Sequence, residues 1–350
     1  MAVTMKEIAK KTGVSRQTVS DVLNNKWKEK RIGEVTRRRI YATAQHLNYR
    51  RNNIARSLVM KKTNILGLLI PCVTYSFWPK FARSVEDTAR ENNYRVLLCH
   101  MNNDWQREIE EIDLLLEHRV AGLIVTPACD RQNNEIYLRL WEEGIPFVLI
   151  DQSLGGLRCN FVGTDNKAGA YEAVTHLIKL GHTRIAHIRG LQSSSTAQDR
   201  LQGYCKALED NNISFDPDLV EGDGFEQDDG YKAAENLLKL ERLPTAIFAV
   251  TDMAAIGAMQ ALKRKGLKIP EDIAIVGFAD IEWASIVEPP LTTMRQPVME
   301  MGRTAVQIIL KEIKEEIKEI HRVILMPTLI VRESCRANTT KEGGDKVGLS

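Results

Sequence analysis

The sequence predicts a small all-helical N-terminal domain followed by a larger α/β body with parallel sheets. Two observations support this division. Residues 1–62 carry 16 Lys and Arg against 4 Asp and Glu, a net charge of +12, whereas the rest of the chain carries 32 against 42, a net charge of −10. The hydrophobic pattern also changes near Ile65, from helical spacing to short β-rich runs that alternate with helical stretches. The basic domain therefore indicates a polyanionic partner that the acidic body does not share.

The composition is typical of a soluble globular protein. The chain has 350 residues, of which 43% are hydrophobic, enough for two or three domains with a core in each. The sequence shows neither a signal-like N-terminal segment nor an apolar run of about 18 residues. We therefore expect a cytoplasmic protein with no membrane partner. The cysteines are far apart and form no CxxC pair, so the sequence indicates no disulfide framework, no metal site and no cofactor: Cys72, Cys99, Cys129, Cys159, Cys205 and Cys335.

Three short helices are expected before residue 50. The first has the capping-box spacing at Thr4 and Glu7 and ends at Gly13, a residue suited to a left-handed stop. Ser15 is a suitable N-cap for the second helix, and a third amphipathic segment runs from about Val35 to Leu47. Apolar residues at helical spacing predict one shared core: Met5, Ile8, Ala9, Val19, Val22, Leu23, Ile40, Ala44 and Leu47.

Two helices separated by a tight glycine turn and packed by a third form the helix-turn-helix arrangement, whose second helix enters the DNA major groove. In SRQTVSDVLN we expect Arg16 to pair with guanine, Gln17 with adenine and Asp21 with the cytosine amino group. Short polar side chains suit phosphate oxygens instead: Thr4, Ser15, Thr18, Ser20 and Asn24. The loop adds possible backbone contacts: Trp27, Lys28, Lys30 and Arg31. A three-helix bundle with a solvated basic face, or one that docks on a protein, remains the alternative.

After a basic connector that is too short to form a stable helix alone, the body contains a series of predicted strands: ILGLLIP, YRVLLCHM, GLIVTP, FVLID, FVGTD, RIAHIRG, TAIFAV and IAIVGF. Such near-continuous apolar runs are typical of parallel strands covered by helices on both faces. The body is too large for one sheet and suits two similar lobes. Near the C-terminus, ILKEIKEEIKEIHR predicts a charged helix and RVILMPTLIVRE predicts strands.

Along nearly its whole length the sequence resembles the lactose repressor and galactose repressor (LacI/GalR) family of bacterial transcription regulators. The resemblance is carried, in chain order, by VTMKEIAKKTGVSRQTVSDVLN, LNYRRNNIARSL, TNILGLLIP, REIEEIDLLLEHRVAGLIV, FVLID, VGTDN, LIKLGHTRIAHI, RLQGYCKALED, FAVTDMAAIGAMQALKRKGLKIPEDIAIVGFAD, PPLTTMRQP and LIVRES. The order and spacing of these segments are highly specific.

The resemblance implies a helix-turn-helix domain at 1–50, a hinge helix or linker at 51–62, an effector-binding and dimerisation domain at 63–335 and a disordered tail at 336–350. The body is expected to be similar to periplasmic sugar-binding proteins, with two lobes joined by three crossovers. We expect lobe 1 at about 63–160 and 293–320, lobe 2 at about 163–290 and 323–333, and crossovers near 160–163, 290–294 and 321–323.

In the family, the connector forms a hinge helix on the operator, and a leucine enters the minor groove and kinks the DNA. By position that leucine is Leu58, with Ala55 allowing close approach and Asn52 at the start of the hinge. The family usually has proline before this asparagine, whereas this chain has Arg51. The substitution removes a rigid entry to the hinge, although Arg51 could bind phosphate instead.

The resemblance also implies an effector between the lobes, contacted by Phe77, Trp78, Asp151, Thr196, Arg200, Phe225, Asp252 and Asp280. Aromatic faces suit sugar or base rings, and Arg and Asp suit hydroxyls or a charged group. After VGF the family commonly has an acidic residue that holds the effector, but this chain has Ala279 there, followed by Asp280. Either Asp280 replaces it, or the ligand is not a typical sugar, or no ligand controls the protein. Singly, each residue also has a structural explanation in the core, in a helix cap or in an ion pair.

We therefore predict a homodimeric, sequence-specific DNA-binding repressor of a carbohydrate or related catabolic operon. It binds an inverted-repeat operator and responds to a sugar, sugar phosphate or related metabolite. An enzyme is disfavoured because the chain lacks GxGxxG, GxxxxGK[ST], HExxH and GxSxG. A transport receptor of the same fold would need an export signal and would not need a basic domain, whereas this chain shows the reverse. A DNA-binding architectural protein without an effector stays open, and the sequence leaves operator, effector and induction or corepression undecided.

Overall fold

The computed structural model describes residues 3–24, 27–49, 63–74, 77–129, 133–316 and 319–335. The chain divides into two compact units, residues 1–62 and 63–350, called here the head and the body. None of the helices in the described ranges is both long and apolar enough to cross a lipid bilayer.

The head contains α1 (Met5–Thr12), α2 (Arg16–Leu23) and α3 (Glu34–His46). The predicted caps are confirmed. Thr4 and Glu7 form the capping box, and Gly13 ends α1 with a φ of 66° in the left-handed region. Ser15 Oγ accepts a hydrogen bond from Thr18 N at the start of α2. Local capping chemistry thus fixes the tight turn between the first two helices.

The three head helices share one core, as the apolar spacing predicts. Its buried members are Ile8, Ala9, Val19, Val22, Leu23, Ile40 and Ala44. The Tyr41 hydroxyl donates a 2.9 Å hydrogen bond to the Val22 carbonyl, which ties α3 to the end of α2. Because the apolar side of α2 is used for packing, its opposite side is available to a partner.

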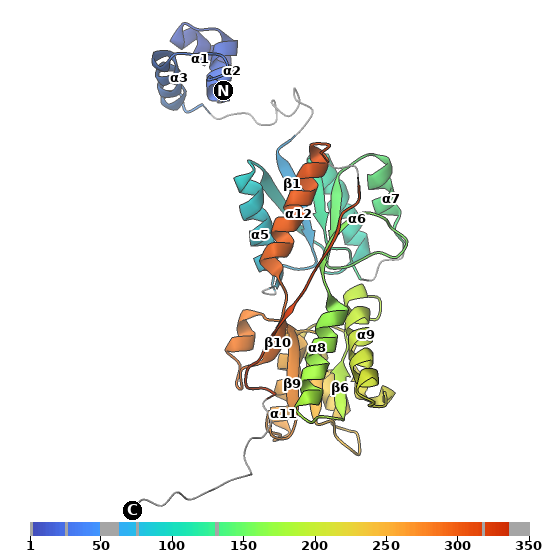
Figure 1. The fold of residues 1–350 in the computed structure, drawn as a ribbon. Coiled ribbons are helices and arrows are strands. Elements are labelled where there is room, and N and C mark those ends of the chain that lie inside the picture. Colours follow the sequence, from blue (N-terminus) through green and yellow to red (C-terminus); the bar gives the residue numbers. More distant parts are fainter. Residues whose placement is uncertain are drawn as a thin grey trace, which may run out of the picture. The chain divides into compact units, whose positions relative to one another are not determined.

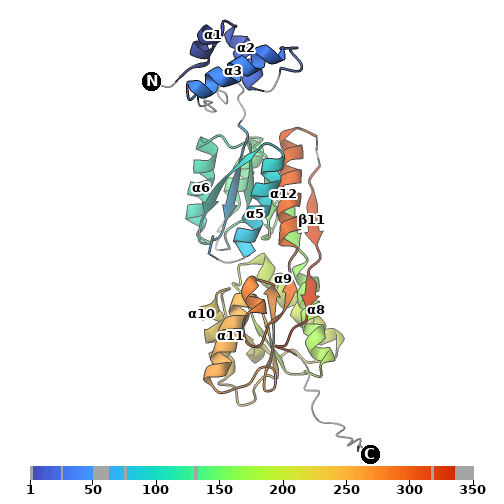
Figure 2. The same cartoon turned by 90° about the vertical axis from the view of Figure 1, so that its left-hand side faces the viewer.

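The body contains two six-stranded sheets, each covered by helices on both faces (Figures 1 and 2). The first has the order β11-β5-β4-β3-β1-β2, with all pairs parallel. Its strands are β1 (Ile65–Ile70), β2 (Arg95–His100), β3 (Gly122–Val125), β4 (Phe147–Ile150), β5 (Asn160–Thr164) and β11 (Arg322–Leu325). Its helices are α5 (Phe77–Glu91) and α12 (Val298–Ile313) on one face and α6 (Trp105–Glu117) and α7 (Glu135–Glu142) on the other.

The second sheet repeats this plan in the order β12-β10-β9-β8-β6-β7, with only β12 antiparallel. Its strands are β6 (Ile185–Ile188), β7 (Val220–Glu221), β8 (Ala246–Ala249), β9 (Ala274–Ala279), β10 (Thr292–Arg295) and β12 (Thr328–Ile330). One face is covered by α10 (Gln227–Leu237) and α11 (Asp252–Arg264), the other by α8 (Asn166–Lys179) and α9 (Ser195–Asp210). The two short helices are η1 (Pro217–Leu219) and η2 (Glu282–Ser285). The predicted doubly covered parallel sheets in two lobes are confirmed.

The crossovers lie later in the chain than the sequence led us to expect. β5 and β11 pair within the first sheet to Thr164 and Leu325, and β10 pairs within the second sheet to Arg295. The chain therefore changes lobes between β5 and α8, between β10 and α12, and between β11 and β12. The expected crossovers near 160–163, 290–294 and 321–323 fall inside these strands and are wrong by a few residues, because a chain leaves a sheet only after its last ladder hydrogen bond.

The charged run ILKEIKEEIKEIHR is helical only at its beginning. α12 ends at Ile313, Glu315 has a φ of 60°, and Arg322 already lies in β11. The helix predicted over the whole run is therefore wrong. The chain must reverse within nine residues to feed β11, and this tertiary requirement outweighs a favourable helical pattern.

A buried amide joins the end of α12 to the two strands at the edge of lobe 1. Asn160 Nδ2 donates to Glu312 Oε2 at 2.8 Å, and Asn160 Oδ1 accepts from His321 N at 2.9 Å. Burial raises the pKa of Glu312 to about 7, while the hydrogen bond from Asn160 partly opposes the shift.

Replacing Glu312 with Gln should alter the pH dependence of stability. The folded-state pKa of about 7 lies above the ordinary value of 4.5, so protonation of Glu312 stabilises the fold at low pH and this contribution is lost as the pH rises through 7. Relative to wild type, E312Q should gain unfolding free energy between about pH 5 and pH 8, as measured by denaturant titration. The exposed Glu316→Gln is the matched control, and identical pH dependence in E312Q and wild type would contradict the assignment.

Candidate nucleic-acid interface and interlobe site

The exposed side of α2 presents two of the predicted base-reading side chains. Arg16 and Gln17 are exposed at the first turn of the helix. One turn later, Asn24 Nδ2 donates to Ser20 Oγ at 3.1 Å. The predicted exposure of Asp21 is wrong: the residue is 8% exposed, and its Oδ1 accepts from Gln17 Nε2 at 2.9 Å. A carboxylate in this position is not presented to a cytosine amino group, because its neighbour on the helix holds it.

The side chains expected on phosphates are local caps in the free head. Thr4 and Ser15 are the N-caps of α1 and α2, and Ser15 Oγ lies 2.8 Å from Thr18 Oγ1. Their role on phosphate stays a prediction. The other predicted head contacts, Asn52, Ala55 and Leu58, and the unusual Arg51, lie outside the described residues.

Cations surround this helix-turn-helix on the head surface. Trp27 lies in the loop before α3, and two cations lie near its ring centre: the Arg37 guanidinium of α3 at 3.8 Å and Lys28 Nζ of the loop at 5.5 Å. These cation–π contacts hold positive charge close to the loop backbone. The exposed cations of the described head are Lys6, Lys10, Lys11, Arg16, Lys28, Lys30, Arg31, Arg38 and Arg39.

The topology of the body brings the polar loops of both lobes together. Each crossover starts at the carboxyl end of a strand: β5 and β11 leave the first sheet, and β10 leaves the second (Figure 1). Because all strands other than β12 run parallel within their sheet, the carboxyl edges of the two sheets face each other. In open parallel sheets, ligands bind at this edge.

Gln152 joins the two lobes across this junction. It follows β4 in lobe 1, is 7% exposed, and donates from Nε2 to Ser194 Oγ at 2.8 Å and to Thr196 Oγ1 at 3.1 Å. Its Oε1 accepts from the Ser195 backbone N–H at 3.0 Å and from Ser195 Oγ at 3.0 Å. Ser153 N also donates to Ser195 Oγ at 2.9 Å. We call these contacts at the N-terminus of α9 the Gln152 clasp.

A buried acid and a buried base interact electrostatically next to the clasp. Arg200 is 4% exposed, donates from Nε to Asn166 Oδ1 at 2.9 Å and from a terminal nitrogen to the Val250 carbonyl at 2.5 Å, and lies 3.9 Å from the centre of the Phe278 ring. Asp151 has a φ of 64°, and its buried Oδ1 has no hydrogen-bond partner within the described part of the chain. Burial raises the pKa of Asp151, and the charge of Arg200 opposes the shift.

Two predicted effector contacts are structural acids. Asp252 is fully buried, and its two oxygens accept from Thr293 Oγ1 at 2.5 Å and from Ile281 N at 2.9 Å. Burial raises its pKa to about 6, against the hydrogen bond from Thr293. Its position at the first turn of α11 joins this helix to β10, and its predicted contact with an effector stays a prediction.

Asp280 is the second of these acids. Its Oδ2 accepts from Arg295 Nε and its Oδ1 from a terminal nitrogen of Arg332, both at 2.6 Å. Burial alone would raise the pKa of Asp280, but the hydrogen bonds from Arg332 and Arg295 outweigh it and lower the pKa. Both oxygens of Asp280 thus bind arginine side chains of its own lobe, and its predicted contact with an effector stays a prediction.

The predicted aromatic residues lie at the junction but are partly packed. Phe77 and Trp78 begin α5, with ring centres 4.8 Å apart in an edge-to-face contact, and both pack against the core of lobe 1. In lobe 2, Phe225 packs against the core, and its carbonyl accepts from Thr251 Oγ1 at 2.6 Å. Thr196 is 3% exposed and belongs to the clasp.

Two protein-family models match the chain. That of the bacterial regulatory proteins, lacI family, matches residues 4–52, and that of the periplasmic binding protein-like domain matches residues 174–335. The HTH-type transcriptional repressor PurR of Histophilus somni (strain 129Pt) is 32% identical over 95% of this chain and 99% of its own length. PurR of Aliivibrio salmonicida (strain LFI1238) is 34% identical over 95% and 98%. The chain belongs to the lacI family of bacterial regulatory proteins.

Solved structures of similar proteins support this assignment. The lac repressor dimer bound to operator and the anti-inducer ONPF has a TM-score of 0.85 at 26% identity, covering 96% of this chain and 100% of that chain. The CelR–cellobiose complex has a TM-score of 0.74 at 29% identity, covering 95% and 99%. The lacI-family chain thus shares a helix-turn-helix head and a two-lobed body with these proteins.

Sequence reasoning missed two junction residues of this lacI-family chain. Gln152 forms the clasp, and Thr126, 1% exposed, has a buried hydroxyl without a hydrogen-bond partner among the described residues. Thr126 directly follows β3, and Gln152 lies two residues after β4. The usable signal is therefore position: the first polar residues after each buried strand lie at the ligand-facing edge.

Replacing Gln152 with Ala should weaken the junction between the lobes. The variant removes the buried hydrogen bonds of the clasp, so we expect a loss of about 1–3 kcal/mol in unfolding free energy and a larger radius of gyration in X-ray scattering. Gln198→Ala is the matched control, because Gln198 lies on α9 but is exposed and bonds only within lobe 2. Equal stability and equal dimensions for Q152A and Q198A would show that the clasp does not hold the lobes.

Proposed function

We propose that this lacI-family chain is a homodimeric, sequence-specific transcription repressor whose operator affinity is set by a small molecule held between its lobes. The observation that carries the proposal is the pairing of a cationic helix-turn-helix unit with a body whose two sheets meet at their carboxyl edges. The PurR relatives are named transcriptional repressors. A duplex-binding repressor acts where the chromosome lies, in the bacterial cytoplasm.

On DNA, the positive head supplies affinity and α2 supplies sequence preference. Phosphate neutralisation by Lys and Arg releases counterions and binds any duplex. Arg16 and Gln17 read base edges, and the short polar residues of the head contact phosphates. We keep Asn52, Ala55 and Leu58 as the hinge contacts, with Leu58 entering the minor groove.

The interlobe chemistry favours a polar effector with a hydrogen-bond donor. Asp151 Oδ1 is a buried acceptor without a partner in the described chain, and such an atom is costly unless a ligand or water donates to it. Arg200 lies close enough to influence its charge, so a hydroxyl can donate to Asp151 while accepting from Arg200. Sugar hydroxyls fit this requirement. The solved CelR neighbour holds cellobiose, and we place a sugar, sugar phosphate or related metabolite here.

The effector acts by changing the angle between the lobes. The two lobes are joined by three crossovers and by the Gln152 clasp, and the connector to the head leaves from lobe 1, directly before β1. A ligand that binds one lobe angle more tightly shifts the population towards that angle. In a dimer this changes the separation of the two connectors, and with it the affinity for two half-sites.

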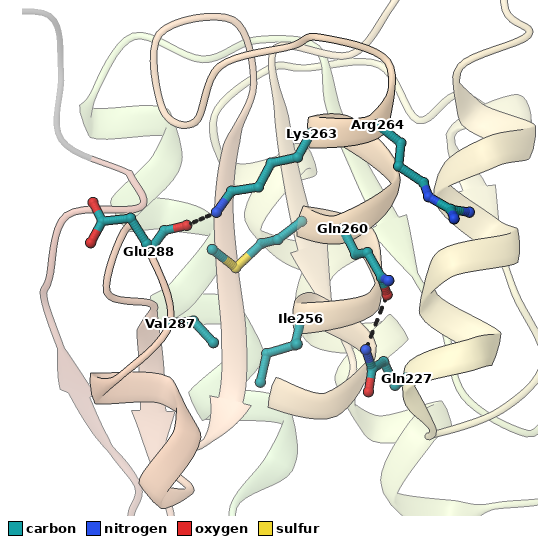
Figure 3. Close-up of a pocket in the computed structure, with 8 residues that line it drawn as sticks. Gln227, Ile256, Gln260, Lys263, Arg264, Val287 and Glu288 are labelled. Atoms are coloured by element: carbon teal, nitrogen blue, oxygen red, sulfur yellow. Dashed lines mark hydrogen bonds between the residues drawn. The ribbon is translucent and has the colours of Figure 1, made fainter.

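For the dimer we propose the face of lobe 2 formed by α10, α11 and the segment between η2 and β10. This face has a hollow of about 530 Å³. Figure 3 shows Ile256, Gln260 and Lys263 along α11, with Val287 and Glu288 opposite them. The neighbouring Trp283 and Ile286 are 57% and 71% exposed, and two large apolar side chains so close together form a patch that a partner can cover. A second copy fits, since the lac repressor neighbour is a dimer.

A regulator without an effector is the second candidate. Two observations favour it. Gln152 already forms hydrogen bonds with the N-terminus of α9, and Asp280 already binds Arg295 and Arg332. A panel of sugars and sugar phosphates distinguishes the two: an effector-controlled protein melts at a higher temperature with its ligand, and Asp151→Ala abolishes that shift.

Replacing Ile286 with Asp should change the preferred DNA sequence from an inverted repeat to a single half-site. Selection of bound sequences from random duplexes by the full wild-type chain should return an inverted repeat, because two heads are held in one dimer. I286D buries a charge at the proposed interface, so it should sediment as a monomer and return single half-sites with at least about tenfold weaker binding.

The matched control is Leu138→Asp on α7, whose side chain is 49% exposed outside the proposed dimer face. It should leave both the oligomeric state and the inverted repeat unchanged. A dimeric I286D would contradict the proposed interface, and a wild-type chain that selects no sequence would contradict the repressor function.

A further inference from the structure

We propose that Asp21 determines base preference indirectly, by holding the Gln17 side chain in one orientation. The inference rests on the proposed function of the head in DNA binding. Gln17 Nε2 donates to Asp21 Oδ1 at 2.9 Å, one helical turn further along α2. Asp21 is 8% exposed, whereas Gln17 is exposed on the helix surface. The acid therefore lies behind the amide that faces the partner.

The donor and acceptor count of the amide supports this role. A glutamine carboxamide has two N–H donors and one oxygen acceptor. One N–H is used on Asp21, which leaves the second N–H and Oε1. One donor and one acceptor are what the adenine edge needs, because N7 accepts and the N6 amino group donates. Gln17 can thus keep its bond to Asp21 while it reads adenine.

The carboxylate also excludes the opposite orientation of the amide. The last torsion of glutamine is soft and roughly two-fold, so a free carboxamide exchanges its oxygen and nitrogen positions at little cost. An ionised carboxylate only accepts hydrogen bonds. Turning the amide over would place Oε1 against Oδ1 of Asp21, two acceptors in contact. Asp21 therefore selects one pattern of donor and acceptor at the surface of α2.

The charge of Asp21 opposes binding to DNA in general. It is one of only 4 acids against 16 cations in residues 1–62, and a negative charge on a recognition helix repels phosphates. This gives Asp21 two effects of opposite sign. Its removal should strengthen binding to unrelated DNA and weaken discrimination between bases.

Two other roles would give different results. A direct contact between Asp21 and a base would act whether or not Gln17 is present. A purely structural role, in which the Gln17–Asp21 pair supports the helix, would change binding to all sequences by the same factor. A double-mutant cycle separates these roles, because it measures whether one residue acts through the other.

The experiment uses the full chain as wild type, Asp21→Asn, Gln17→Ala and the double variant. Each is titrated with the best selected duplex, with every single-base change of that duplex, and with an unrelated duplex. D21N should lower discrimination at one base pair by roughly five- to a hundredfold, the contribution of one bidentate contact, while it tightens binding to the unrelated duplex. In the Q17A background, D21N should change discrimination by no more than about twofold.

Two further variants control for charge and for folding. Glu29→Gln removes another exposed acid of the head and should tighten unrelated binding without any loss of discrimination. Gln17→Met changes only the exposed partner and leaves the buried Asp21 in place. The base pair at which Q17M loses discrimination should be the one at which D21N loses it. The thermal melting of each variant reports the fold.

A loss of discrimination by D21N that persists in the Q17A background would overturn the inference in favour of a direct base contact. So would losses that map to different base pairs, or equal weakening on every duplex. Failure of the wild-type chain to prefer any sequence is a distinct result, because it removes the proposed function itself and this inference with it.

Discussion

The body is organised by the direction of its strands. All three crossovers leave a parallel sheet at its carboxyl end, so both lobes present their polar loops to each other. Apolar residues fill the four helix–sheet layers. Buried polar groups such as Gln152, Asp151, Arg200 and Thr126 are consequently concentrated at the junction, where each must find a partner in the opposite lobe, in its own lobe or in a ligand.

This constraint explains why the junction can act as a sensor. The Gln152 clasp satisfies the N-terminus of α9 from the other lobe, so opening the lobes exposes donors and acceptors that are paired when closed. Beside it, Asp151 Oδ1 has no hydrogen-bond partner among the residues that the structure describes. A ligand that supplies the missing donor stabilises the closed lobes, and one that competes with Gln152 stabilises the open lobes. The same site can therefore serve either sign of control.

Much of the fold follows from local signals in the sequence. Capping at Thr4 and Ser15, the glycine stop at Gly13 and the apolar runs of the strands are short-range effects, and the three predicted head helices and the main strands are confirmed. The ends of the crossover strands and the early end of α12 depend on pairing between distant segments, which a single sequence does not display.

The site was less predictable for the same reason. The family resemblance implies Asp151, Asp252 and Asp280 as ligand contacts, but Asp252 is held in the structure by Thr293 and Asp280 by Arg295 and Arg332. Asp21 has helical spacing from Arg16 and Gln17, and only the three-dimensional packing shows that Gln17 covers it. Partners chosen by tertiary contact decide whether a polar residue is free to bind.

The central claim is that the cationic head, and not the acidic body, binds the duplex. The most direct test compares the full chain with a fragment that begins at Thr63, a unit with its own cores, across a series of salt concentrations. The account predicts that log affinity of the full chain falls linearly with log salt, as expected when several phosphates are neutralised, and that the fragment does not bind. Comparable binding by the fragment, or affinity of the full chain that is independent of salt, would contradict it.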